Sequence, residues 1–265
     1  MKTKTKIKFL SALLLGLTVL LSACNKDGCT DESATNYDAN AENDDGSCVY
    51  DAGGDNLVDY LNPSLTYGEV MDIEGNKYAT IQIGSQRWMA ENLRTSKFCN
   101  GETITNITES NQWDDLTTEA WVHYNNQSEN EIPYGKLYNW YAVSDPRNIC
   151  PCGWHVPSDE DWSILTDYLG GESVSGGKMK ATGTKYWAEP NKDATNESGF
   201  SGLPGGNRSF DGVFLGMGLA GGWWSSTPGE IAGSAAFRSL DHDHGNVHKT
   251  FLAKYRGFSV RCIQD

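Results

Sequence analysis

The richest group of metal-ligating side chains in the sequence is a short histidine-rich tract near the C-terminus. His242, His244 and His248 are interleaved there with Asp241 and Asp243. In an extended strand His242 and His244 would lie on one face, and this spacing can chelate Zn²⁺ or Cu²⁺. The tract is polar throughout, however, which favours a solvated turn between two late strands. We expect the turn, with metal binding as the alternative.

A second candidate is the triplet Glu189-Pro190-Asn191. It resembles the Glu-Pro-Asn sequence with which sugar-binding C-type lectins hold Ca²⁺ and vicinal sugar hydroxyls. The usual Trp-Asn-Asp partner is missing, and Trp223-Trp224-Ser225 stands nearest. Trp187 and Trp113 lie in loop-like surroundings and are predicted to be exposed, where their rings can stack on sugars. The predicted ligand-binding residues are Trp187, Glu189 and Asn191.

A third candidate is an acidic segment, residues 27–51, that contains almost no core-forming side chains. We expect Cys29 and Cys48 to form a disulfide, worth about 3 kcal/mol by loop closure. The segment resembles a short acidic disulfide module of Bacteroidetes surface proteins. It is predicted to be either a solvated spacer or a calcium module, since Ca²⁺ needs six to eight oxygens but no full EF-hand loop is present. The candidate calcium ligands are Asp31, Asn36, Asp38, Asn40, Asp44 and Asp45.

Catalytic chemistry has little support. Cys152 and His155 are close enough to suggest a thiol nucleophile and its base. Apart from Cys24 the cysteines are even in number, so disulfides explain Cys152 better. No acid/base pair or phosphate-binding loop accompanies them, and we expect a protein that is not an enzyme.

The N-terminus has the features of an export signal. Four lysines and no acid precede the apolar stretch Phe9–Leu21, which is too short to span a bilayer comfortably. The following Leu21-Ser22-Ala23-Cys24 resembles the lipobox of bacterial lipoproteins. We expect residues 1–23 to be removed and Cys24 to carry acyl chains such as palmitate, which anchor a protein stably. Because Asn25 rather than aspartate follows, outer-membrane placement is favoured, with the cell surface as the expected face.

The composition limits the classes of molecule that the chain is expected to bind. The chain has 265 residues and a formal net charge of −14, which disfavours nucleic acid and anionic lipid. It also has 29 glycines and nine tryptophans, a mixture typical of loop-rich folds with large aromatic anchors. Cations and neutral ligands such as glycans fit this surface best.

The elements that position these residues follow from periodicity and capping. Alternation over Tyr78–Gly84 predicts a half-buried strand. Ser158, with Asp161 three residues on, predicts a helix that ends at Gly170. A second helix is predicted over Lys136–Val143. Further strands are predicted over Phe210–Leu215, Ala235–Leu240 and Phe258–Cys262, and residues 52–68 are predicted to be a linker. Strands, then helices, then strands indicate an α+β fold.

Six ordered segments resemble the Fibrobacter succinogenes major paralogous domain family, over residues 68–265. They are Arg87–Leu93, Tyr134–Val143, Cys150–Ser158, Gly199–Gly206, Trp223–Thr227 and Gly257–Cys262. The family is similar to C-type-lectin-like folds. The resemblance therefore implies two helices flanking one small twisted antiparallel sheet, with a long loop region and adjacent termini. Trp88, Trp140, Trp154 and Trp224 fall within these motifs, Trp162 lies in the predicted helix that follows one of them, and all five are expected in the core.

The family also bears on the cysteines. Its members usually have cysteines at the positions of Cys150 and Cys262, which implies that these two pair. Cys99 and Cys152 both depart from the family pattern, which suggests that they pair with each other. The exchanged pairing, Cys99 with Cys150 and Cys152 with Cys262, remains an alternative.

We therefore expect three regions: a signal peptide over 1–23, an anchor, acidic module and linker over 24–67, and the family domain over 68–265. The expected function is that of a membrane-anchored binding or adhesion module that contacts glycans or surface proteins. A structural surface-coat lipoprotein is the alternative, and an uncharacterised enzyme the third reading.

Overall fold

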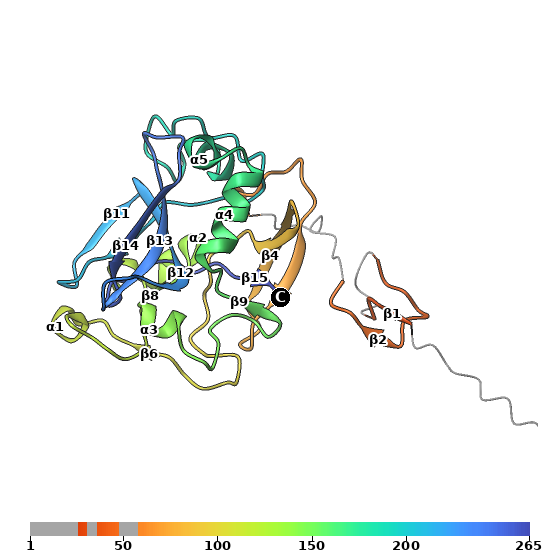
Figure 1. The fold of residues 1–265 in the computed structure, drawn as a ribbon, viewed down its shortest axis with the longest axis horizontal. Helices are drawn as coiled ribbons and strands as arrows, with labels where there is room; N and C mark the ends of the chain where they lie inside the picture. Colours follow the sequence, from red (N-terminus) through yellow and green to blue (C-terminus); the bar gives the residue numbers. More distant parts are fainter. Residues whose placement is uncertain (1–25, 31–35, 48–57) are drawn as a thin grey trace, which may run out of the picture.

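The computed structural model describes residues 26–30, 36–47 and 58–265 (Figure 1). The signal peptide, Cys24, Asp31 and Cys48 lie outside these residues. In the acidic module, β1 (Asp27–Gly28) and β2 (Asn43–Asp44) form a short parallel pair. Cys29 is buried and disulfide-bonded.

The rest of the described chain contains both helices and strands, which agrees with the predicted α+β class. The helices are α1 (Ser110–Trp113), α2 (Glu131–Tyr134), α3 (Trp140–Val143), α4 (Asp159–Tyr168) and α5 (Glu172–Met179), with 3₁₀ turns over Tyr124–Asn126 and Ser128–Asn130. The strands are β3 (Gly68–Met71), β4 (Lys77–Ile83), β5 (Gln86–Met89), β6 (Thr105–Asn106), β7 (Ala120–Val122), β8 (Leu137–Tyr138), β9 (Trp154–His155), β10 (Gly205–Arg208), β11 (Phe214–Met217), β12 (Ala220–Pro228), β13 (Ser234–Asp241), β14 (His248–Ala253) and β15 (Ile263–Gln264).

The expectation of one small antiparallel sheet is wrong, because the strands form several sheets. One has the order β3-β4-β5-β15-β9, another β11-β10-β12-β13-β14, and a third β6-β7-β8. Two of the pairs, β10 with β12 and β6 with β7, are parallel. The C-terminal strand β15 lies between β5 and β9, so the two ends of the domain meet in one sheet, as the family resemblance implies (Figure 1).

The core is built around large aromatic side chains. Trp88, Trp162, Phe200 and Trp223 contact one another, with ring centroids 4.8 Å apart for Trp88 and Trp162. All five tryptophans expected in the core are buried, which confirms that prediction. The predicted linker is wrong in its second half, because Tyr60, Leu61 and Tyr67 pack into this same core.

The helix predicted from Ser158 is confirmed by its cap. The Ser158 hydroxyl accepts from the Asp161 backbone N–H, and the Asp161 carboxylate accepts from the Ser158 backbone N–H. Trp162 and Leu165 face the core. This capping box fixes where α4 begins.

The helix predicted over Lys136–Val143 is wrong in its first half. Leu137 and Tyr138 form β8, and Tyr138 also bonds to Phe258 through both backbone groups. The Asn139 side chain then accepts from the Ala142 N–H, so α3 begins only after it. Long-range strand pairing therefore overrides the local helical pattern.

Two of the predicted strands are displaced. β11 begins at Phe214, because residues 209–212 form a turn closed by the Gly212 N–H and the Ser209 carbonyl. Residues 257–259 form only isolated bridges, since each pairs with a different segment as the chain crosses between sheets. β4 and β13 match their predictions, although Tyr78 is buried as well, so β4 is covered on both faces.

Two disulfides tie the domain together. Cys150 bonds to Cys262 and Cys99 to Cys152, which confirms the first predicted pairing and excludes the exchanged one. The predicted partner of Cys29 lies outside the described residues.

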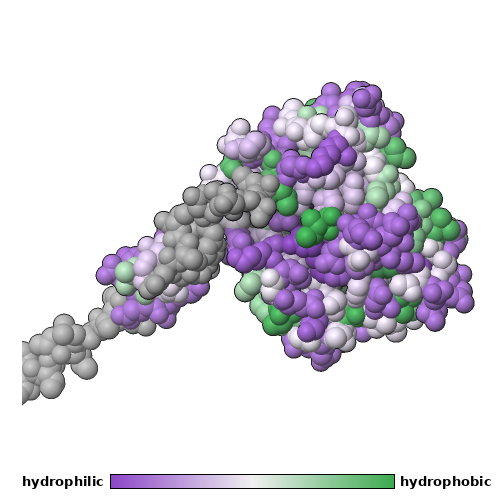
Figure 2. Space-filling model, turned by 180° about the vertical axis from the view of Figure 1, so that it is seen from behind, coloured by the Kyte–Doolittle hydropathy of each residue, from purple (hydrophilic) through white to green (hydrophobic). Residues whose placement is uncertain are grey.

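No helix among the described residues is long and apolar enough to cross a membrane. On the face seen in Figure 2 most of the surface is hydrophilic, and hydrophobic residues are scattered over it.

Candidate metal centre

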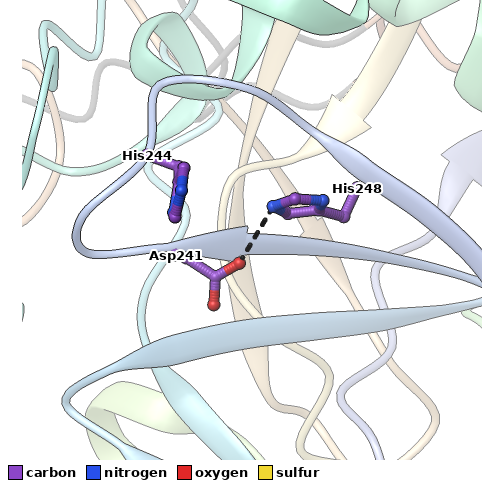
Figure 3. Close-up of side chains that lie close together, drawn as sticks. All are labelled: Asp241, His244 and His248. Atoms are coloured by element: carbon purple, nitrogen blue, oxygen red, sulfur yellow. Dashed lines mark ion pairs between the residues drawn. The ribbon is translucent and has the colours of Figure 1, made fainter.

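The candidate site is carried by the β13–β14 hairpin. Its strands are antiparallel, with Ser239 opposite His248. Because cross-strand partners share a face and side chains alternate along a strand, Asp241 lies on the same face as His248. The turn, residues 242–247, brings His244 back over that face, as Figure 3 shows. The predicted solvated turn between two late strands is therefore confirmed.

The three side chains converge to ligating distance. Their donor atoms all lie within 4.8 Å of one another. His248 Nε2 is 3.4 Å from Asp241 Oδ2, and the two imidazole rings meet edge to face at 5.8 Å. Among the described residues, no other group of three or more His, Cys, Asp or Glu side chains brings its donor atoms this close together.

The site is open to solvent. The side chains of His244 and His248 are 54% and 47% exposed. His248 also borders a shallow depression of about 570 Å³ on the surface, which is lined by Glu172, Ser173, Asn246, Val247, His248 and Lys249. A ligand can therefore approach the three donor atoms directly.

A neighbouring carboxylate orients one of the imidazoles. His244 Nδ1 lies 2.6 Å from Asp243 Oδ1, which leaves Nε2 of His244 as the nitrogen for an external ligand. Partial desolvation would raise the pKa of Asp243, but its hydrogen bond with His244 lowers the pKa below the usual value. Carboxylate–histidine pairs of this kind fix the tautomer and the ring orientation in metal sites.

A buried ammonium holds the backbone beneath the site. Lys180 Nζ donates to the carbonyl oxygens of Asp241 (2.9 Å), His244 (2.8 Å) and Lys192 (2.7 Å). Burial lowers the pKa of Lys180 to about 8, against the opposing effect of nearby carboxylates. Two of the three candidate ligands are thus fixed through their own main chain.

Helix α5 packs against the same turn at backbone distance. The Gly177 N–H donates to the Gly245 carbonyl, and the Val247 N–H donates to the Glu172 carbonyl. A Cβ at Gly176 would lie 2.2 Å from the Asn246 carbonyl oxygen, so only glycine permits this approach. The absence of a side chain at Gly176 therefore allows α5 and the turn to pack at backbone distance.

The Glu189 loop lies beside the histidine tract. His242 Nδ1 is 2.9 Å from the Glu189 carbonyl, and the Lys192 N–H donates to the His242 carbonyl. Two segments that the sequence presented separately thus form one surface. His242, however, does not belong to the cluster, in which Asp241 and His248 converge with His244. The alternative raised from the sequence, with His242 and His244 as the ligands, therefore differs from the group that the structure brings together.

Two predicted sugar-stacking residues are buried. Trp187 is 1% exposed and its indole N–H donates to the Gly202 carbonyl, while Trp113 lies beneath Arg208, whose guanidinium is 4.5 Å from the ring centroid. The expectation that they are exposed is therefore wrong. The Asn191 amide donates to the carbonyls of Ala181 and Gly183, which leaves Glu189 as the exposed member of the predicted set.

The acidic module uses its carboxylates locally. Asp38 pairs with Lys26 and accepts from the Asn40 N–H, and Asp45 accepts from the Ser47 N–H. The side-chain hydrogen bond from Lys26 lowers the pKa of Asp38. The calcium hypothesis also depends on Asp31, which lies outside the described residues, so it stays a prediction.

The disulfide of Cys152 leaves no thiol to act with His155. His155 instead lies 2.6 Å from the Asp265 carboxylate and 3.7 Å from that of Asp161.

The comparison with protein families gives one match. The model of the Fibrobacter succinogenes major domain matches residues 81–264. No curated protein and no solved structure matches the chain.

Proposed function

Because the chain belongs to the Fibrobacter succinogenes major domain family, we propose that it is an extracytoplasmic binding or adhesion module anchored to the outer membrane through Cys24. Its recognition surface would be the β13–β14 turn together with the neighbouring Glu189 loop. The C-type-lectin-like architecture implied by the family resemblance is part of this proposal, and the meeting of the domain's two ends in one sheet supports it.

The observation that carries the proposal is the pairing of exposed polar side chains with a fixed backbone. Glu189, His244 and His248 are exposed, while Lys180 and α5 hold the main chain beneath them. Exposed side chains on a rigid scaffold are typical of binding loops. Ordering them on binding costs little entropy because the backbone is already fixed.

The covalent and electrostatic features agree with this setting. Two disulfides in the domain are typical of oxidising, extracytoplasmic compartments. The formal net charge of −14 favours neutral or cationic partners over nucleic acid and anionic lipid. Neutral glycans and the basic surfaces of other proteins are therefore the partner classes that we propose.

The test is a glycan array probed with the detergent-solubilised full chain, first with Ca²⁺ and then with EDTA. We expect saturable hits that weaken at least tenfold in Glu189→Gln. Glu230→Gln, at an exposed position in the β12–β13 connection, is the matched control and should bind as the wild type does. A blank array from folded, oxidised protein would refute glycan recognition and favour the structural surface coat.

A further inference from the structure

We propose that Asp241, His244 and His248 form a solvent-accessible Zn²⁺ site with an open coordination position. This inference goes beyond the proposed function and does not depend on it, since metal binding can be measured without any partner.

The donor set suits zinc. Two imidazole nitrogens and one carboxylate oxygen are common protein ligands of Zn²⁺, and sites with three protein ligands keep a fourth position for water or an incoming group. The hairpin alone supplies all three residues, from the end of β13, the turn and the start of β14. No distant segment has to move for the ligands to come together.

The distances fit a zinc coordination sphere. Ligands about 2.0–2.1 Å from zinc in a tetrahedron lie about 3.3 Å from one another. His248 Nε2 and Asp241 Oδ2 already stand at 3.4 Å. The largest separation within the group is below 4.8 Å, so His244 needs a shift of about 1–2 Å, within the reach of a side-chain rotation.

Two neighbouring residues hold the candidate ligands in place, as the surroundings of metal ligands commonly do. Asp243 binds Nδ1 of His244, which leaves the other ring nitrogen for a metal ion. Lys180 anchors the carbonyls of Asp241 and His244, so the main chain at both ligands is fixed before a metal arrives. Metal binding then has to order side chains only.

His248 lines the surface depression, and the side chains of His244 and His248 are open to solvent, so an open coordination position would be reachable from outside. A carboxylate or imidazole from a bound partner can enter there and complete the coordination. In this role, which unlike zinc binding itself rests on the proposed binding function, the zinc ion would join this chain to its partner.

The test is isothermal titration of Zn²⁺ into the detergent-solubilised full chain, purified through a histidine-free tag. We expect one equivalent to bind, and Asp241→Asn, His244→Gln and His248→Gln each to weaken binding at least tenfold. His242→Asn is the matched control, because it removes an adjacent imidazole outside the cluster and keeps a hydrogen-bond donor toward the Glu189 carbonyl. It should change the affinity less than twofold.

Near-UV circular dichroism checks that each variant is folded, and X-ray absorption of the zinc-loaded wild type provides a readout that needs no variant. We expect a first shell with two imidazoles at about 2.0 Å. An absence of saturable binding up to 100 µM Zn²⁺, or equal affinity in the three ligand variants and the wild type, would overturn the proposal. A tenfold loss in His242→Asn would also overturn it and favour the His242–His244 pair instead.

Discussion

The ion pairs that join the start of α4 to the β13–β14 hairpin give the most specific prediction about stability. Arg238 on β13 is 1% exposed, and its guanidinium lies 2.8 Å from Asp159 Oδ1 at the start of α4. Among the described residues, two further guanidinium nitrogens of Arg238 have no hydrogen-bond partner. Lys249 on β14 reaches the other oxygen of Asp159 at 2.6 Å. Asp159 is thus the counter-charge on which a buried cation depends.

Replacement of Asp159 by asparagine leaves Arg238 buried without a counter-charge. Loss of one partner of a buried ion pair costs about 3–5 kcal/mol, and we expect about 3 because the Asp159 side chain is 25% exposed. The Lys249 pair is more exposed and adds at most about 1 kcal/mol. For a chain of this size, 3 kcal/mol corresponds to a fall in Tm of about 6–12 °C.

Urea unfolding followed by near-UV circular dichroism measures this loss, and a double-mutant cycle separates it from other effects. Arg238→Met alone should cost less than Asp159→Asn, because a methionine removes the buried charge together with its need for a partner. The double variant should recover at least half of the Asp159→Asn loss. Equal and additive losses in the two single variants would refute the assignment of the cost to an unpaired Arg238.

The same pair predicts a pH dependence with a definite sign. Burial would raise the pKa of Asp159, but hydrogen bonds from Lys249 and Arg238 hold it below the ordinary 3.8. A carboxyl group whose pKa is lowered in the folded state contributes stability above its unfolded pKa and loses it as the pH falls through the folded value. Acid unfolding of the wild type below about pH 4 should therefore be steeper than that of Asp159→Asn.

Four further perturbations follow. Lys180→Met leaves three buried carbonyls unbonded and should lower the free energy of unfolding by about 2–3 kcal/mol in urea. Gly176→Ala places a Cβ against the Asn246 carbonyl and should lower Tm by several degrees in a thermal melt, through overpacking of about 1–3 kcal/mol. Removal of the disulfide between Cys150 and Cys262 should cost about 0.7 kcal/mol more than removal of the other one, because it spans 112 rather than 53 residues. Cys24→Ser should abolish incorporation of labelled fatty acid in growing cells.

The sequence was sufficient to predict the structure wherever residues adjacent in the chain determine it. The capping box at Ser158 and the polar turn between two late strands both follow from a few adjacent residues. The helix predicted over Lys136–Val143 failed because Tyr138 pairs with Phe258, far along the chain. Sequence periodicity carries no information on such a partner.

The candidate site was predictable as a region but not as a set of ligands. Alternation in a strand places His242 and His244 together, whereas the hairpin register places Asp241 with His248. The register depends on which residues end each strand, and that is the least certain feature of a sequence-based prediction. The sequence signal that could have identified the group is the spacing of Asp241, His244 and His248, which are three and four residues apart around a polar turn.

Trp187 and Trp113, which were predicted to be exposed but are buried, and the fixed backbone of the candidate site have one physical cause in common, namely buried cations. Trp187 and Trp113 have polar neighbours in sequence, but Lys180 and Arg208 lie over their rings at 5.5 and 4.5 Å. Each cation also donates to three backbone carbonyls, and within the described part of the chain neither forms an ion pair. Each therefore covers an aromatic side chain and fixes a loop at once.

Arg261 follows the same principle at the centre of the domain. It is fully buried, donates to the carbonyls of Phe200 and Ser201 and to the Asn92 side chain, and stacks on Phe200 at 4.1 Å. Burial lowers its pKa to about 9, so the desolvation of this cation is costly and must be offset by these hydrogen bonds. Short strands leave many backbone carbonyls unpaired, and buried cations satisfy them where regular structure does not. Exposed side chains carried on such loops, His244 and Glu189 among them, stand on a backbone that these hydrogen bonds hold in place, which lowers the entropic cost of binding.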